Sequence, residues 1–179
     1  MRGVPLHINL YTPHKDVRKL IWQRLNDVDR EVIRCAHNLC RTPIFTPLQI
    51  DHIAGNGHLK QLQWAHDCGY KMNTGTCNAA AKGGHLEVLQ WARANGCAWD
   101  TRTCSSAAYG GRLEVLQWAR VNGCRWNECT CSEAAYGGHL EVLQWARANG
   151  APWDTRTCMW AEKNGHQDAL KWARENGAP

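Results

Sequence analysis

The sequence predicts an all-α solenoid of stacked helix-turn-helix repeats with an N-terminal helical cap. The first reason is a fixed period, because a Gly followed by His or Arg recurs every 27 residues. These glycines are Gly57, Gly84, Gly111, Gly138 and Gly165. The second reason is that the copies are nearly identical, since the octapeptide LEVLQWAR occurs three times at the same spacing. A period of this length, held over at least three copies, is typical of a solenoid whose repeats shield one another.

The overall composition fits a folded, soluble protein. Of the 179 residues, 44% are hydrophobic and 21% are charged, which excludes a disordered chain. No apolar run approaches the roughly 20 residues that a membrane span needs, and Met1–Tyr11 lacks the apolar stretch of a secretory signal. We therefore expect an intracellular, cytoplasmic protein without a membrane partner, whose ten cysteines are reduced thiols.

The charge distribution argues against nucleic-acid binding. The net charge is +5, and residues 1–45 supply most of it, with eight Lys or Arg against four Asp or Glu. Residues 46–179 hold thirteen basic and twelve acidic side chains and are almost neutral. A nucleic-acid groove would need a basic patch on the repeats, so we do not expect one.

Residues 1–45 form the first predicted segment, ahead of the repeats in residues 46–179. Within residues 13–38, apolar side chains recur at helical spacing. They include Val17, Leu20, Ile21, Trp22 and Leu25. One interpretation is a helical cap that shields the first repeat, as a solenoid requires. The other interpretation, which does not exclude the first, rests on a resemblance to a known family.

The same segment resembles an F-box. The resemblance rests on Pro13, on an Asp-Val start, on the Leu-Ile-Trp core at residues 20–22, and on the Leu-x-Asp-x-Asp turn at residues 25–29. It implies that these apolar side chains dock a Skp1-type adaptor. The repeats would then present a target protein to a cullin ubiquitin ligase.

Each repeat is predicted to hold two helices. A threonine begins the first helix as a candidate N-cap, at Thr76, Thr103, Thr130 and Thr157, and this helix closes at the glycines before the second one. The second helix runs from about His85 to Asn95 in the best-copied form. An acidic residue lies in its first turn and an arginine in its last, the order that the helix dipole favours.

The repeated apolar residues predict the core. Leu86, Leu89 and Ala92 make an apolar face that one hairpin cannot bury alone, so stability lies in the interfaces between repeats. We expect Trp99, Trp126 and Trp153 to fill the seams between repeats. The recurring cysteines, from Cys77 to Cys158, are predicted to be small buried hydrophobes, because their spacing does not match a zinc site. We expect neither a metal nor another cofactor.

The repeats resemble the ankyrin repeat. The stretch Ala80–Gly96, AAKGGHLEVLQWARANG, matches the ankyrin pattern through the end of its first helix, its Gly-His turn, its second helix and its closing Gly. The usual period is 33 residues, and the six missing here fall where ankyrins carry a β-hairpin. The resemblance therefore implies rudimentary or absent β-hairpins. Short repeats rich in Trp-Ala-Arg resemble those encoded by giant DNA viruses of amoebae.

The resemblance implies a non-enzymatic scaffold that binds a partner protein on a concave face made by the first helices. Positions that vary among the copies are the candidate contacts, since they share one helix face. They are Asn78, Ala79, Lys82, Ser105, Ser106, Tyr109, Ser132, Glu133, Tyr136, Met159, Trp160 and Lys163. Trp160 departs most from its counterparts. It is either an interface anchor or, with Met159, a cover for the terminal repeat.

The sequence offers no catalytic residues. It has no nucleophile elbow, no phosphate-binding Gly loop and no His-Glu-x-x-His motif. We therefore predict that the chain is not an enzyme. Its main alternative function is the F-box-type substrate receptor described above.

Overall fold

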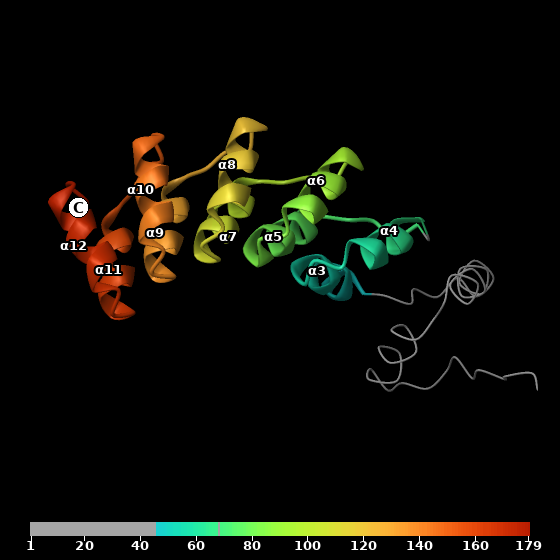
Figure 1. The fold of residues 1–179 in the computed structure, drawn as a ribbon, viewed down its shortest axis with the longest axis horizontal. Coiled ribbons are helices and arrows are strands. Elements are labelled where there is room, and N and C mark those ends of the chain that lie inside the picture. The colour runs from blue at the N-terminus through green and yellow to red at the C-terminus, as the bar shows by residue number, and fades with distance from the viewer. Residues whose placement is uncertain (1–45, 68) are drawn as a thin grey trace, which may run out of the picture. The chain divides into compact units, whose positions relative to one another are not determined.

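Residues 46–67 and 69–179 are described by the structure, a computed structural model, and belong to one compact unit of five helical hairpins (Figure 1). The inner helices are α3 (Pro47–Gly55), α5 (Thr74–Gly83), α7 (Thr101–Tyr109), α9 (Glu128–Tyr136) and α11 (Thr155–Lys163). The outer helices are α4 (Leu59–Asp67), α6 (Leu86–Ala94), α8 (Leu113–Val121), α10 (Leu140–Ala148) and α12 (Gln167–Glu175). The predicted cap and the predicted docking residues Val17, Leu20, Ile21, Trp22 and Leu25 lie outside the described residues.

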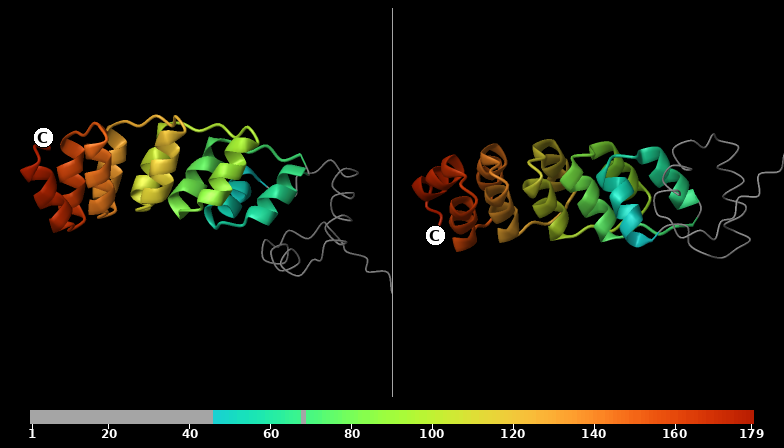
Figure 2. Two further views of the ribbon diagram at one scale, coloured as in Figure 1. Left: turned by 45° about the horizontal axis from the view of Figure 1, so that its top comes forward. Right: turned by 90° about the horizontal axis from the view of Figure 1, so that it is seen from below.

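The hairpins stack side by side in two layers of helices (Figure 2). Each inner helix packs closely against the next inner helix, whereas consecutive outer helices approach one another much less. Because the inner layer is the tighter one, the row of hairpins bends toward it. Within the two described ranges no residue is in a β-strand, and the links between hairpins are short extended segments. The predicted all-α stacked fold is confirmed for this part of the chain.

The inner helices α5, α7, α9 and α11 begin three residues earlier than the sequence pattern predicts, whereas α3 is capped by Thr46. The N-caps of those four helices are Asn73, Asp100, Asn127 and Asp154, and each of these side chains accepts a hydrogen bond from the backbone N–H two residues on. The predicted cap threonines are instead the third residue of each helix and are fully buried. The prediction failed because Thr and Asx are both good caps, and the sequence pattern did not separate them.

The ends of the inner helices and the outer helices follow the sequence. The helix α5 closes at Gly84, whose φ of 84° is the left-handed conformation that Gly adopts without strain. The following outer helix, predicted over about His85–Asn95, extends over Leu86–Ala94. Its side chains Leu89 and Ala92 are fully buried. The same residues are buried in the later copies, which makes one continuous core along the stack.

Tryptophans join each hairpin to the next on the outer layer. The guanidinium of Arg93 in α6 lies 4.2 Å from the ring centroid of Trp99, in the link to the next hairpin. That ring in turn meets Trp118 of α8 edge-on at 5.7 Å. The same Arg-Trp-Trp arrangement recurs in the next two seams, with Arg–Trp distances of 4.0 Å. The predicted seam role of Trp99 and its copies is therefore confirmed.

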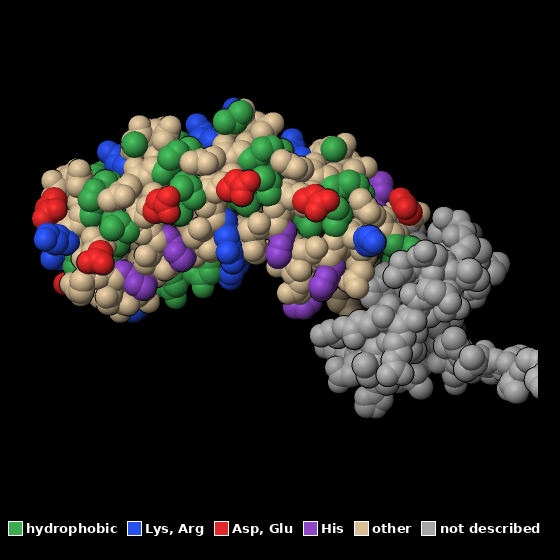
Figure 3. Space-filling view, viewed as in Figure 1, with side chains coloured by type: hydrophobic (Ala, Val, Ile, Leu, Met, Phe, Trp, Pro, Cys, Tyr) green, Lys and Arg blue, Asp and Glu red, His purple; other side chains and the backbone are tan. Residues whose placement is uncertain are grey.

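The histidines that follow the repeated glycines form hydrogen bonds to the preceding repeat and not within their own turn. The ring Nε2 of His139 lies 3.0 Å from the backbone oxygen of Tyr109, in the preceding inner helix. His85 and His166 make the same bond to the carbonyl oxygens of Gly55 and Tyr136. Arg112 replaces a histidine in this series and donates to the carbonyl of Lys82 at 3.3 Å. Figure 3 shows histidine side chains on both sides of a basic patch, below a row of acidic side chains.

Candidate binding surface

Five side chains at the C-terminal ends of the inner helices lie in one row, which we call the aromatic strip. Lys82, Tyr109, Tyr136 and Lys163 occupy the same position in four consecutive repeats, and Trp160 lies three residues before Lys163. The rings of Tyr109 and Tyr136 stack with centroids 5.6 Å apart. Trp160 meets Tyr136 edge-on at 5.3 Å. The strip is continuous because the repeat places equivalent side chains of neighbouring helices within contact distance.

A lysine ammonium caps each end of the strip. The Lys82 Nζ lies 4.3 Å from the ring centroid of Tyr109, and the Lys163 Nζ lies 5.0 Å from that of Trp160. At these distances an ammonium is attracted by the ring face. Both lysines are exposed, so each keeps N–H groups available to an acceptor on another molecule.

Besides Leu48 in α3, two large apolar side chains of the inner helices are open to solvent. Tyr136 is 37% exposed and Met159 is 48% exposed, while Tyr109 and Trp160 are half-buried. The Trp160 ring packs back onto Tyr136 of the preceding helix, so it belongs to the strip. An aromatic cluster with exposed edges and cations beside it is the kind of surface that protein partners bury.

Glu133 is the one acidic member of the predicted contact set. It is half-buried on α9, and burial raises the pKa of its carboxyl, an effect that the nearby positive charges of Arg156 and Lys82 reduce. The protonated form is therefore favoured more than in a free glutamate. Ser106 and Ala79, at the equivalent position of earlier repeats, are also half-buried.

Three of the predicted contact residues point into the seams instead. Asn78 accepts a hydrogen bond at 2.7 Å from Thr103 of the next inner helix. Ser105 and Ser132 are only 8% and 3% exposed, and each donates to a carbonyl of its own helix. The two serines lie inside the stack, where a partner protein cannot reach them. Their variation among repeats misled the sequence reasoning, because a polar seam also tolerates different residues.

The comparisons with known proteins identify the fold. No known family profile matches the chain, and no curated protein does. Among solved structures, the crystal structure of the human ASB11 ankyrin repeat domain matches 73% of this chain and 69% of its own, with a TM-score of 0.58 and 19% identity. The fold is an ankyrin-repeat solenoid. The predicted resemblance is thereby confirmed at the level of the fold.

The ankyrin-type stack in the described ranges holds no cluster of three or more His, Cys, Asp or Glu that could bind a metal. Cys77, Cys104 and Cys131 are fully buried, and Cys158 is half-buried. The first three therefore fit the predicted role of small core residues. None of the helices described is long and apolar enough to cross a membrane.

Proposed function

We propose that the repeats form a non-enzymatic scaffold that binds a partner protein on the inner-helix face, with the aromatic strip at the centre of contact. The observation that carries this proposal is the strip itself, an unbroken run of rings that ends in a lysine on each side. Its members stand at positions that vary among otherwise near-identical repeats. A framework that stays constant while one face varies is suited to recognition.

The chemistry of the strip favours a partner segment with apolar side chains between acidic ones. Aromatic rings contribute most when a partner excludes water from them, and Tyr136 and Met159 are the most exposed apolar side chains of the inner helices after Leu48. The ammonium groups of Lys82 and Lys163 would pair with carboxylates at the ends of such a segment. Glu133 would favour a neutral group or a hydrogen-bond donor opposite it.

The test uses substitutions that the chain already tolerates. Tyr136→Lys places at this position the residue found at Lys82 and Lys163, and Trp160→Ser places the residue found at Ser106. Both variants should fold normally. The control is Val121→Ala on the outer layer, where Val121 is 87% exposed and its counterparts are alanines in two repeats.

We expect immobilised wild-type chain to capture a partner from cell lysate that either strip variant captures at least tenfold less. A tenfold loss is about 1.4 kcal/mol, within the range for an interface aromatic. Val121→Ala should capture the same amount as wild type. Equal capture by wild type and both strip variants would remove this surface from the proposal. Binding that falls steeply with salt and is competed by RNA or DNA would replace the protein partner with a nucleic acid.

A second function is favoured by the apolar helical spacing of residues 13–38. We infer that this segment could dock a Skp1-type adaptor and make the chain a substrate receptor of a cullin ubiquitin ligase. Purified adaptor should then bind the full chain, and Ile21→Asp should abolish that binding. The control variant is His37→Asp, because His37 is not one of the regularly spaced apolar residues. Failure of the wild-type chain to bind the adaptor would leave the repeats as a plain scaffold.

A cytoplasmic location, in an infected host cell if the chain is viral, is part of the same proposal. The location is supported by the ten cysteines, which we expect to be reduced thiols, and the viral origin by the resemblance of the short Trp-Ala-Arg repeats to those of giant DNA viruses. Fractionation of cells that express the full chain would test the location directly.

A further inference from the structure

Two buried thiols meet inside the second hairpin. Cys77 lies in α5, and Cys97 lies in the turn after α6, twenty residues later. Their sulfur atoms are 3.0 Å apart, about 1 Å farther than the sulfurs of a disulfide. Both side chains are buried, and the Cys97 thiol also lies 3.0 Å from the carbonyl oxygen of Asn73. The hairpin fold thus holds this pair in a fixed position.

The surroundings make the two sulfurs unequal. The Cys77 thiol donates to the Cys97 sulfur, and this bond lowers the pKa of Cys97 with help from the positive charge of Arg93. The same bond, together with burial, raises the pKa of Cys77. Cys97 is therefore the thiol that forms the thiolate more readily, and thiolates are the nucleophiles in disulfide exchange.

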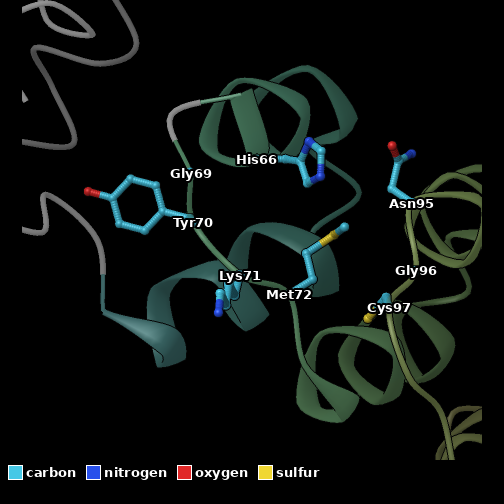
Figure 4. Close-up of a pocket in the computed structure, with 8 residues that line it drawn as sticks. All are labelled: His66, Gly69, Tyr70, Lys71, Met72, Asn95, Gly96 and Cys97. Carbon is cyan, nitrogen blue, oxygen red and sulfur yellow. The ribbon is translucent and has the colours of Figure 1, made fainter. Parts of the chain in front are cut away.

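A cavity between the first two hairpin links is lined by Cys97. Its volume is about 300 Å³, and its lining includes His66, Met72, Asn95 and Cys97 (Figure 4). The later seams carry an arginine and a stacked tryptophan where this seam has His66 and Met72. The opening beside Arg120, Trp126 and Trp145 has no cysteine in its lining, whereas the one beside Met72 is lined by Cys97.

We propose that Cys77 and Cys97 form a reversible intrachain disulfide by exchange with a low-molecular-weight disulfide that enters this cavity. The Cys97 thiolate attacks one sulfur of the small disulfide, forms a mixed disulfide and releases one small thiolate. The Cys77 sulfur, after losing its proton, attacks the Cys97 sulfur and releases the second. Two protein thiols are oxidised, one small disulfide is reduced to two thiols, and the thiol protons pass to the leaving groups.

The bond would link α5 to the turn after α6 and so strengthen the second hairpin. Closing a twenty-residue loop restricts mainly the unfolded chain, so the oxidised protein is the more stable form. The next hairpin holds the equivalent pair, Cys104 and Cys124. The two after it have Ala151 and Ala178 in place of the second cysteine, so only part of the stack can respond.

The experiment treats the full, native chain with oxidised glutathione at pH 8, blocks free thiols with iodoacetamide and maps tryptic peptides by mass spectrometry. Trypsin cuts after Lys71, Lys82, Arg93 and Arg102, so the two cysteines fall on separate peptides. We expect a Cys77–Cys97 cross-link that dithiothreitol reverses, with a rise in Tm of about 5–10 °C. The same treatment in 6 M guanidinium should give mixed pairings instead.

Three variants keep the proposal falsifiable. Cys97→Ala copies Ala151 and should lose both the cross-link and the rise in Tm, while the control Cys124→Ala should keep them. Met72→Trp copies Trp99, fills the cavity and should slow cross-linking of Cys77 to Cys97 at least tenfold. The proposal is overturned if the native pair stays reduced while other thiols react, if Cys97 stops at the mixed disulfide, or if cross-linking lowers the Tm.

Discussion

The seam threonines allow a matched test of what a buried hydroxyl contributes to this stack. Thr103 and Thr130 occupy the same position in consecutive inner helices, and both are fully buried. Thr103 donates to Asn78 at 2.7 Å. At the next seam the counterpart of Asn78 is the shorter Ser105, which bonds its own helix, and the Thr130 hydroxyl has no hydrogen-bond partner among the described residues.

Replacing each threonine with valine should therefore change stability in opposite directions. Valine has nearly the same shape without the hydroxyl. Thr103→Val removes a bond worth about 1 kcal/mol and leaves the Asn78 oxygen unpaired, which lowers the free energy of unfolding. Thr130→Val removes an unpaired buried hydroxyl, whose desolvation costs about 1–3 kcal/mol, and should raise it. We expect the two variants to differ by about 2–4 kcal/mol.

Equilibrium unfolding of the full chain in urea, under reducing conditions, measures this difference. A second variant, Ser105→Asn, places at this seam the residue that accepts the Thr103 hydrogen bond at the previous one, Asn78. It should stabilise wild type by about 1 kcal/mol and give no gain in the Thr130→Val background. The reasoning is refuted if both valine variants are destabilised equally, or if Ser105→Asn stabilises both backgrounds alike.

Three further predictions concern the seams and the strip. His139→Ala should lower the free energy of unfolding by about 1 kcal/mol through loss of its bond to the Tyr109 carbonyl, whereas His139→Arg, which copies Arg112, should not. Glu133→Gln should raise the Tm at pH 7, because the raised pKa means that burial opposes the charged form. This gain should shrink as pH falls through that pKa toward 4, and a constant gain would contradict it. Trp126→Ala should cost about 3–5 kcal/mol in chemical unfolding, more than Val121→Ala at the exposed edge, which should change stability by less than about 0.5 kcal/mol.

Much of the fold could be predicted from the sequence because the period fixes it. One copy reveals little, but five copies in register show which residues each hairpin requires. The outer helix was predicted within a residue at each end, since Gly84 and Gly96 mark its boundaries with backbone conformations that other residues rarely adopt.

The start of the inner helix could not be chosen from residue type alone. Threonine after a loop satisfies the usual cap signal, and so does Asp100 three residues earlier. The structure shows that the Asx residue caps and the threonine packs. The alternation of Asn and Asp at this position was the available signal, because those two residues share the side-chain oxygen that a cap needs and little else.

The candidate surface was harder to predict, because variation among repeats has two causes. Asn78, Ser105 and Ser132 vary because the seam has room either for an asparagine that bonds the next helix or for a serine that bonds its own. Tyr109 and Tyr136 differ from their counterparts Lys82 and Lys163 because this position lies on the open face, where packing does not fix the residue type. The sequence spacing places the seam residues and the open-face tyrosines on the same side of each inner helix. Only the structure shows which of them the next inner helix covers.

The outer-layer stacks explain how the open face can vary without loss of the fold. Ring distances of 5.7, 5.9 and 6.0 Å in three successive Trp–Trp contacts show that the seams have nearly the same geometry. Because those stacks and the His bonds set the spacing of the repeats, the residue at the strip position does not have to. A lysine or a tyrosine therefore fits equally well there. The side chains that fix the architecture lie buried in the seams or on the outer layer, and those we propose for recognition lie on the open face of the inner helices, so each set can change independently of the other.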